Sequence, residues 1–163
     1  MMNIIYVVMA ISLTCLVAFG GISYINPDAP IRAVASRGLV AQYEAIHSGI
    51  VAYRSSNNGI TPDAIALFKG FLPQGDIPSF GPAYNGYGWS MSVPQGETRP
   101  VICLTVNDSS EAKIQSSLAF ATEIERRSSA KVSLGGTCGD NTPFAQVVVA
   151  DIPTVPVLTI RGF

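Results

Sequence analysis

The first 26 residues contain no Asp, Glu, Lys, Arg or His, and this uncharged apolar run constrains the chain more than any other feature. Within it the segment from Ile4 to Ile25 has Tyr6 and Tyr24 near its ends. A helix of that length, rising 1.5 Å per residue, crosses the hydrocarbon core of a bilayer, which is about 30 Å thick. Aromatic rings near both ends suit the membrane–water interface. We therefore expect residues 1–25 to form a single transmembrane anchor.

Cleaved targeting segments are the alternatives to an anchor. A signal peptide normally begins with a basic region, and no Lys or Arg precedes this apolar run. A lipoprotein signal would need a small residue directly before Cys15 and a leucine or similar residue three before it. Ser12-Leu13-Thr14-Cys15 matches that pattern poorly, and Cys15 is more simply a small buried apolar residue. An uncleaved anchor is therefore the favoured interpretation.

The side of the membrane on which the rest of the chain lies depends on two opposing signals. Arg32 and Arg37 follow the apolar run, and the positive-inside rule alone would place them in the cytoplasm. Apart from Cys15, however, the chain has one pair of cysteines, Cys103 and Cys138, which suits a structural disulfide in an oxidising compartment. Two buried thiols in a cytoplasmic domain remain the alternative. We expect the disulfide and a periplasmic domain.

A stalk helix is expected directly after the anchor, within residues 26–58. Its apolar residues recur every three to five positions, close to one helical face: Ile31, Val34, Leu39, Tyr43, Ile46, Ile50 and Tyr53. Gly38 and Gly49 each weaken a helix by about 1 kcal/mol relative to Ala, so packing must hold this one together. Asn58-Gly59 can adopt left-handed backbone angles and end the helix.

The remaining residues, 59–163, predict a globular α+β domain. Thr61-Pro62 is typical of a helix start and predicts a short helix to about Lys69, and Asp108 or Ser109 is expected to cap a longer helix that ends near Arg127. Strands are expected over residues 87–93, 99–106, 131–136, 144–150 and 156–163. The predicted fold is a transmembrane helix continuing into an amphipathic helix, followed by a small, mostly antiparallel sheet with a packed helix.

Charge and histidine content argue against several functions. Ten basic and 11 acidic residues give a net charge of -1, which would not attract nucleic acid. The single histidine, His47, has Glu44 three residues before it, but the pair lacks a nucleophile and suits a solvated helix face better. The Thr-Cys-Gly-Asp segment around Cys138 has no partner motif that would make the thiol a nucleophile. No catalytic, cofactor-binding or metal-binding residues are expected, so we predict a protein that is not an enzyme.

Three aromatic residues offer an alternative binding function. Tyr84, Tyr87 and Trp89 could form a stacking platform for a sugar or a base. Little positive charge lies near them in the sequence, and we expect them to be core and hairpin residues instead. A secreted glycan-binding module that uses these rings remains a hypothesis of another class.

The order of parts, with a break at Tyr53-Arg54-Ser55-Ser56-Asn57-Asn58-Gly59, resembles type IV pilins and pseudopilins. The chain lacks the basic leader, the cleavage glycine and the glutamate that begin a prepilin. It more closely resembles the PilM family of thin-pilus (type IVb) biogenesis proteins of conjugative plasmids, in size, uncleaved anchor and Gly- and Tyr-rich middle. The resemblance implies a bacterial inner-membrane protein with a periplasmic domain whose partners are pilus assembly proteins or pilins, without a small-molecule substrate or cofactor. A minor pilin or pseudopilin within a filament is the nearest alternative.

Overall fold

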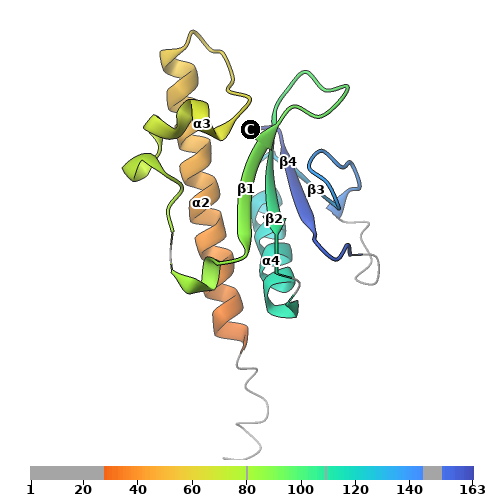
Figure 1. The fold of residues 1–163 in the computed structure, drawn as a ribbon. Coiled ribbons are helices and arrows are strands. Elements are labelled where there is room, and N and C mark those ends of the chain that lie inside the picture. Colours follow the sequence, from red (N-terminus) through yellow and green to blue (C-terminus); the bar gives the residue numbers. More distant parts are fainter. Residues whose placement is uncertain (1–27, 80, 109, 145–151) are drawn as a thin grey trace, which may run out of the picture.

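The computed structural model describes residues 28–79, 81–108, 110–144 and 152–163 (Figure 1). The expected anchor over residues 1–25 and nearly all of the expected strand at 144–150 lie outside these residues. Among the described helices, none combines the length and apolar character needed to cross a bilayer.

The described residues form an α+β fold with one four-stranded antiparallel sheet, in agreement with the expected small antiparallel sheet and packed helix. Its helices and strands are α2 (Asp28–Ser56), α3 (Ile65–Phe68), β1 (Tyr87–Ser92), β2 (Val101–Val106), α4 (Glu111–Arg127), β3 (Lys131–Gly135) and β4 (Val157–Arg161). Single 3-10 turns are η1 (Lys69–Phe71), η2 (Pro73–Gly75) and η3 (Pro82–Tyr84). The strand order is β1-β2-β4-β3. The last strand, β4, thus lies between β2 and β3 and pairs antiparallel with both.

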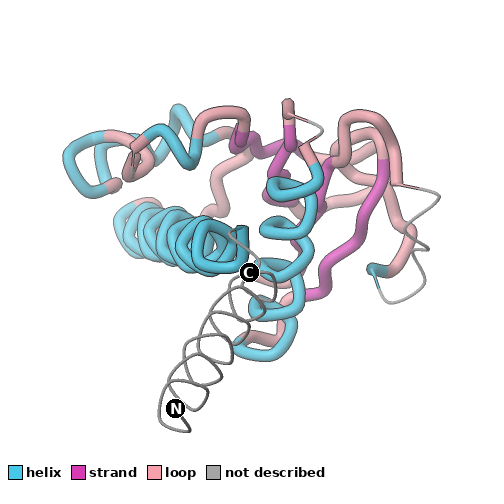
Figure 2. The backbone as a smooth tube through the Cα atoms, turned by 90° about the horizontal axis from the view of Figure 1, so that it is seen from below, coloured by secondary structure: helices cyan, strands magenta, loops and turns pink. Residues whose placement is uncertain are grey.

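The main core lies where one face of the sheet meets α2 and α4, two helices that run beside each other (Figure 2). Alternate residues of the two central strands face it, among them Leu104 of β2 and Leu158 of β4, both wholly buried. They share one cluster with Ile46 of α2 and Phe120 of α4. Period-two alternation in the strands and helical spacing in α2 and α4 therefore bury their apolar residues against one another.

The opposite face of the sheet carries the disulfide. Cys103 of β2 and Cys138 are bonded, with their Cα atoms 5.7 Å apart, and Val101 and Val157 pack beside them. Cys138 belongs to the segment that follows β3, so the bond fastens this segment across the back of the sheet.

Arg161, at the end of β4, holds two loops on the same back face. Its guanidinium donates to the carbonyl oxygen of Gly139 at 2.6 Å and to the carboxylate of Glu97 at 3.1 Å. It also donates to the hydroxyl of Ser133 at 2.7 Å. Because Arg161 is only about a fifth exposed, these charge-assisted contacts tie the loop after β3 and the β1–β2 loop to the sheet.

Among the residues of the predicted α2 stripe whose burial the structure describes, most face the core, and Val34 does not. Leu39, Ile46 and Ile50 are at most 1% exposed, and Tyr43 is 5% exposed. Val34, in contrast, is 55% exposed, because Ala35 takes the inward position one residue later.

The glycines of α2 are sites of close approach to other segments. The ring of Tyr84 lies directly on Gly38, and the side chains of Phe68 and Leu72 lie on Gly49. A methyl group at Gly38 would stand 2.1 Å from the hydroxyl oxygen of Tyr84. Packing across these two glycines is thus part of what offsets their low helix propensity.

The end of α2 matches the expectation from Asn58-Gly59. Asn58 has a φ of 53° and Gly59 a φ of 81°, both in the left-handed region. The amide of Gly59 donates to the carbonyl oxygen of Arg54 at 2.8 Å, which closes the last turn. The left-handed backbone of Asn58 and Gly59 therefore ends the helix, as the sequence predicts.

Both predicted helix starts in the globular part are wrong in position. The short helix begins at Ile65 rather than at Pro62, because Ala64 is extended and Pro62 is buried outside the helix. The longer helix, α4, begins at Glu111, and Asp108 accepts a hydrogen bond from the amide of Ser110 just before it. Both helices thus begin later in the chain than the sequence predicts.

Candidate interaction groove between helices α2 and α4

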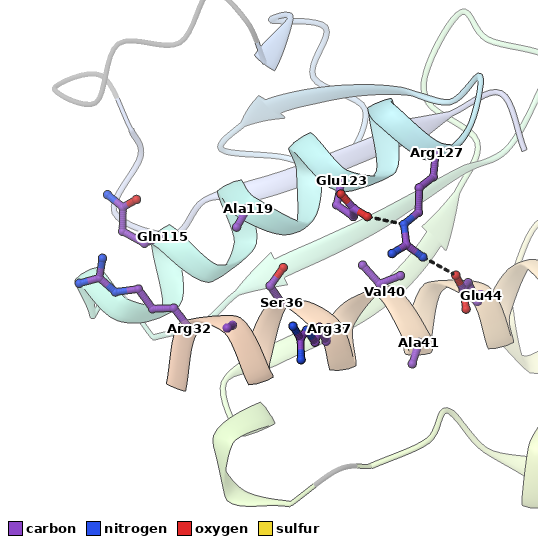
Figure 3. Close-up of a pocket in the computed structure, with 11 residues that line it drawn as sticks. Arg32, Ser36, Arg37, Val40, Ala41, Glu44, Gln115, Ala119, Glu123 and Arg127 are labelled. Carbon is purple, nitrogen blue, oxygen red and sulfur yellow. Dashed lines mark hydrogen bonds and ion pairs between the residues drawn. The ribbon is translucent and has the colours of Figure 1, made fainter. Parts of the chain in front are cut away.

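A groove of about 710 Å³ runs between the N-terminal half of α2 and the outer side of α4 (Figure 3). It is lined from α2 by Arg32, Ala33, Ser36, Arg37, Val40, Ala41 and Glu44, and from α4 by Gln115, Ala119, Glu123 and Arg127. Small residues on both helices, such as Ser36 and Ala119, leave the space between them open. Charged side chains line both walls, so the groove suits a polypeptide surface better than an apolar ligand.

Arg127 links the two walls. Its guanidinium lies 3.6 Å from the carboxylate of Glu44 on α2 and also contacts Glu123 on its own helix (Figure 3). A smaller cavity of about 230 Å³, lined by Tyr43 and His47 among others, shares Glu44 and Arg127 with the groove. These two exposed side chains therefore border both cavities.

The carboxylate of Glu123 is held by two arginines. Hydrogen bonds from Arg126, at 2.7 Å, and from Arg127 lower its pKa to about 2. Because its pKa is depressed, the Glu123 carboxylate stays ionised and keeps both ion pairs until the pH approaches 2. The stability that this adds is complete above about pH 4.5 and is lost as the pH falls toward 2.

We predict that Glu123 titrates well below the ordinary range of a glutamate side chain. In a 13C-detected NMR titration, its side-chain carboxyl should change shift with a midpoint near pH 2. The substitution Arg126→Gln should raise that midpoint, because the largest stabilising hydrogen bond is removed. Lys131→Gln, on an exposed residue of β3, is the control and should leave it unchanged. A midpoint near pH 4.5 in the unmodified protein would contradict the arrangement.

His47 and Glu44 do not form the base and orienting carboxylate considered from the sequence. Glu44 pairs with Arg127, while the imidazole of His47 lies against Tyr43 with ring centroids 6.2 Å apart. Both side chains are exposed. The arrangement is that of a solvated helix face.

The three aromatic residues considered for sugar binding use their polar atoms within the fold. The hydroxyl of Tyr84 donates to the carbonyl oxygen of Val34 at 2.8 Å, and that of Tyr87 donates to the carbonyl oxygen of Lys113 at 3.0 Å. The indole nitrogen of Trp89 donates to the side-chain oxygen of Gln42 at 2.8 Å. These bonds join β1 and the turn before it to α2 and α4. A stacking platform needs free ring faces, and Tyr84 is only 8% exposed.

No metal centre is assembled by the described residues, since no three His, Cys, Asp or Glu side chains lie close enough together to hold an ion. The groove itself was missed from the sequence. A usable signal was present on α4, where Glu123 precedes Arg126 and Arg127 by three and four residues. The matching charge, Glu44, lies far away in the sequence and gives no such signal.

Comparisons with models of protein families, with curated proteins and with solved structures found no match for this chain. Its function must therefore be inferred from its own residues and their arrangement.

Proposed function

We propose that this chain is a non-enzymatic, single-pass inner-membrane component of type IVb (thin) pilus biogenesis, similar to the PilM family. Its α+β domain stands in the periplasm and acts through contacts with pilus assembly proteins or pilins. One observation carries the proposal: an uncharged apolar run leads directly into the 29-residue helix α2, which is both stalk and part of the head.

The shape of α2 supports a role in protein contacts. One side of the helix is buried against the sheet and α4, while the other side remains exposed along its length, including Val34 at 55% and Val51 at 52%. The groove beside it, between Arg37 and Glu123, offers both charges and small apolar positions to a partner. Such a mixed surface is typical of interfaces that form and dissociate.

The disulfide supports the periplasmic side. A disulfide between Cys103 and Cys138 persists in an oxidising compartment and is rare in the cytoplasm. In the proposed orientation we therefore give the disulfide more weight than the positive-inside rule applied to Arg32 and Arg37.

A minor pilin or pseudopilin within a filament is the second candidate. The observation that favours it is the long helix α2 lying along an antiparallel sheet, which a filament subunit also requires. Intact-mass measurement of the membrane form separates the two, because processing of a prepilin shortens the chain.

The proposal predicts that residues 1–25 hold the protein in the membrane. In bacterial membranes washed with carbonate, the protein should stay in the pellet, and protease added to spheroplasts should degrade its C-terminal domain. Leu13→Arg with Leu16→Arg should release it, because each arginine at the centre of a span costs about 2.5–3.5 kcal/mol. Leu67→Arg, at a head residue that is 50% exposed, is the control and should remain in the pellet. A soluble, shortened protein would refute the anchor.

A separate crosslinking experiment tests whether the groove contacts a partner protein. A photo-crosslinking residue in place of Ala41, within the groove, should join the protein to a pilus assembly protein or a pilin in cells that assemble pili. The same residue in place of Gln95, an exposed position of the β1–β2 loop, is the control and should give no such product. If the protein stays in the membrane but the probes at Ala41 and Gln95 give the same crosslinked products, the anchor is supported. The groove is then not the binding surface.

A further inference from the structure

A second polar cavity lies at the end of α2 furthest from Asp28. It has a volume of about 360 Å³ and is lined by Arg54, Thr61, Arg99, Pro100, Gly162 and Phe163. These residues come from the last turn of α2, the segment before α3, the β1–β2 loop and the end of β4. Figure 1 shows the end of α2 and the chain end after β4 together at the top of the molecule. Three parts of the chain distant in sequence, residues 54–61, 99–100 and 162–163, thus meet at one site.

Two guanidinium groups, those of Arg54 and Arg99, line this cavity. Arg54 and Arg99 are both exposed. Neither side chain forms an ion pair or a hydrogen bond with another residue in the part of the chain that the structure describes. Two such cations on one concave surface attract an anion, since neither is held in an ion pair with another described residue.

Glu97, the acidic residue nearest to Arg99 in the sequence, forms an ion pair with Arg161 rather than with Arg99. The carboxylate of Glu97 accepts hydrogen bonds from Arg161 at 3.2 Å and 3.1 Å. Arg161 directly precedes Gly162, so this ion pair both occupies Glu97 and ties the loop carrying Arg99 to the strand end that lines the cavity. The backbone that carries Arg99 is thereby held near the strand end that lines the cavity.

We propose that this cavity binds an oxyanion, either a carboxylate or a phosphate group. A guanidinium presents planar N–H donors that match both groups with paired hydrogen bonds, and the hydroxyl of Thr61 adds a further donor. Pro100 and Phe163 form the apolar part of the lining and reduce the competition from water. The C-terminal end of α2 carries a partial negative charge, so binding depends on both arginines acting together.

The distance to the membrane decides between sources of the anion. Arg54 lies about 40 Å along α2 from Asp28, at 1.5 Å per residue. If residues 1–25 span the bilayer, as the proposed function has it, the lipid headgroups around the anchor lie too far away to fill the cavity. The source is then either a free anion or an acidic side chain of a partner protein.

Titration of the 15N-labelled full chain in nonionic detergent tests the site. Sodium phosphate and sodium glutarate are added separately, with chloride adjusted to constant ionic strength. We expect saturable shifts of the backbone amides of Thr61 and Gly162, while that of Gly88, in β1, stays constant. Saturation with phosphate alone identifies a phosphate site, and saturation with glutarate alone identifies a site for acidic side chains. Saturation with neither anion overturns the proposal.

Variants of the two arginines show whether they carry the binding. Arg54→Gln and Arg99→Gln should each weaken binding by about tenfold, and the double variant should abolish the shifts. The control combines Lys131→Gln with Arg126→Gln, which removes the same charge away from the cavity and should leave the affinity unchanged. Both target side chains are exposed and make no hydrogen bond or ion pair with the described residues, so the variants should melt like the unmodified protein. Equal loss of affinity in target and control variants would overturn the proposal, because binding would then reflect overall charge.

Discussion

Replacing both Cys103 and Cys138 by alanine should lower the free energy of unfolding by about 4 kcal/mol. The disulfide joins residues 35 positions apart and so restricts the unfolded chain strongly, whereas the folded chain loses few contacts. The segment around Cys138 also covers the back of the sheet. If this segment loosens, Val101 and Val157 become more exposed to solvent. The effect should therefore exceed that of truncating two ordinary small side chains.

Urea unfolding followed by tryptophan fluorescence measures this effect, since Trp89 lies against the core residue Phe120. The double variant and the reduced unmodified protein should unfold at similarly lowered urea concentrations. Cys15→Ala, outside the described residues, is the matched control and should unfold like the unmodified protein. Equal midpoints for the double variant and the oxidised protein would show that the disulfide does not stabilise the fold. Alkylation before reduction should also leave Cys103 and Cys138 unmodified.

Features set by neighbouring residues in the sequence could be predicted. The end of α2 follows from Asn58-Gly59, because left-handed backbone angles are available there. The strand at 101–106 follows from its β-branched residues, and α4 follows from helical spacing of its apolar residues. Each of these signals lies within a single element.

Features set by contacts between distant segments could not be predicted. Nothing in the sequence places β4 between β2 and β3, because strand order depends on which edges remain open once the earlier strands have paired. The bond between Arg161 and Glu97 joins residues 64 positions apart. The groove is equally non-local, since Glu44 and Arg127 meet only after α2 and α4 have packed. The candidate site is thus a product of the tertiary fold.

Gly38→Ala should lower the free energy of unfolding by about 2–3 kcal/mol, although alanine favours a helix over glycine by about 1 kcal/mol. The added methyl carbon would lie 2.1 Å from the hydroxyl oxygen of Tyr84 and 2.3 Å from two of its ring carbons. Tyr84 cannot yield easily, because its hydroxyl is bonded to the carbonyl oxygen of Val34. The ring must leave the helix surface, which exposes apolar area and breaks that hydrogen bond.

Two neighbouring positions on α2 separate the clash from helix propensity. At Gly49 a methyl carbon would lie 2.9 Å from a terminal methyl of Leu72, a flexible group, and 3.0 Å from a ring carbon of Phe68, so both contacts are looser than those at Gly38. Gly49→Ala should therefore change stability far less than Gly38→Ala. Ser48→Ala, at an exposed site, should be slightly stabilising because only the propensity changes.

A double-mutant cycle with Tyr84→Ala then assigns the loss at Gly38 to its cause. Once the ring is absent, Gly38→Ala meets no obstacle and should stabilise the helix by about 1 kcal/mol. The two substitutions should therefore be strongly non-additive in thermal or urea unfolding. If Gly38→Ala cost the same with and without the Tyr84 ring, contact between the two residues would not explain the effect. If the cycle instead shows the expected coupling, the turn η3 can pack Tyr84 against α2 because position 38 has no side chain.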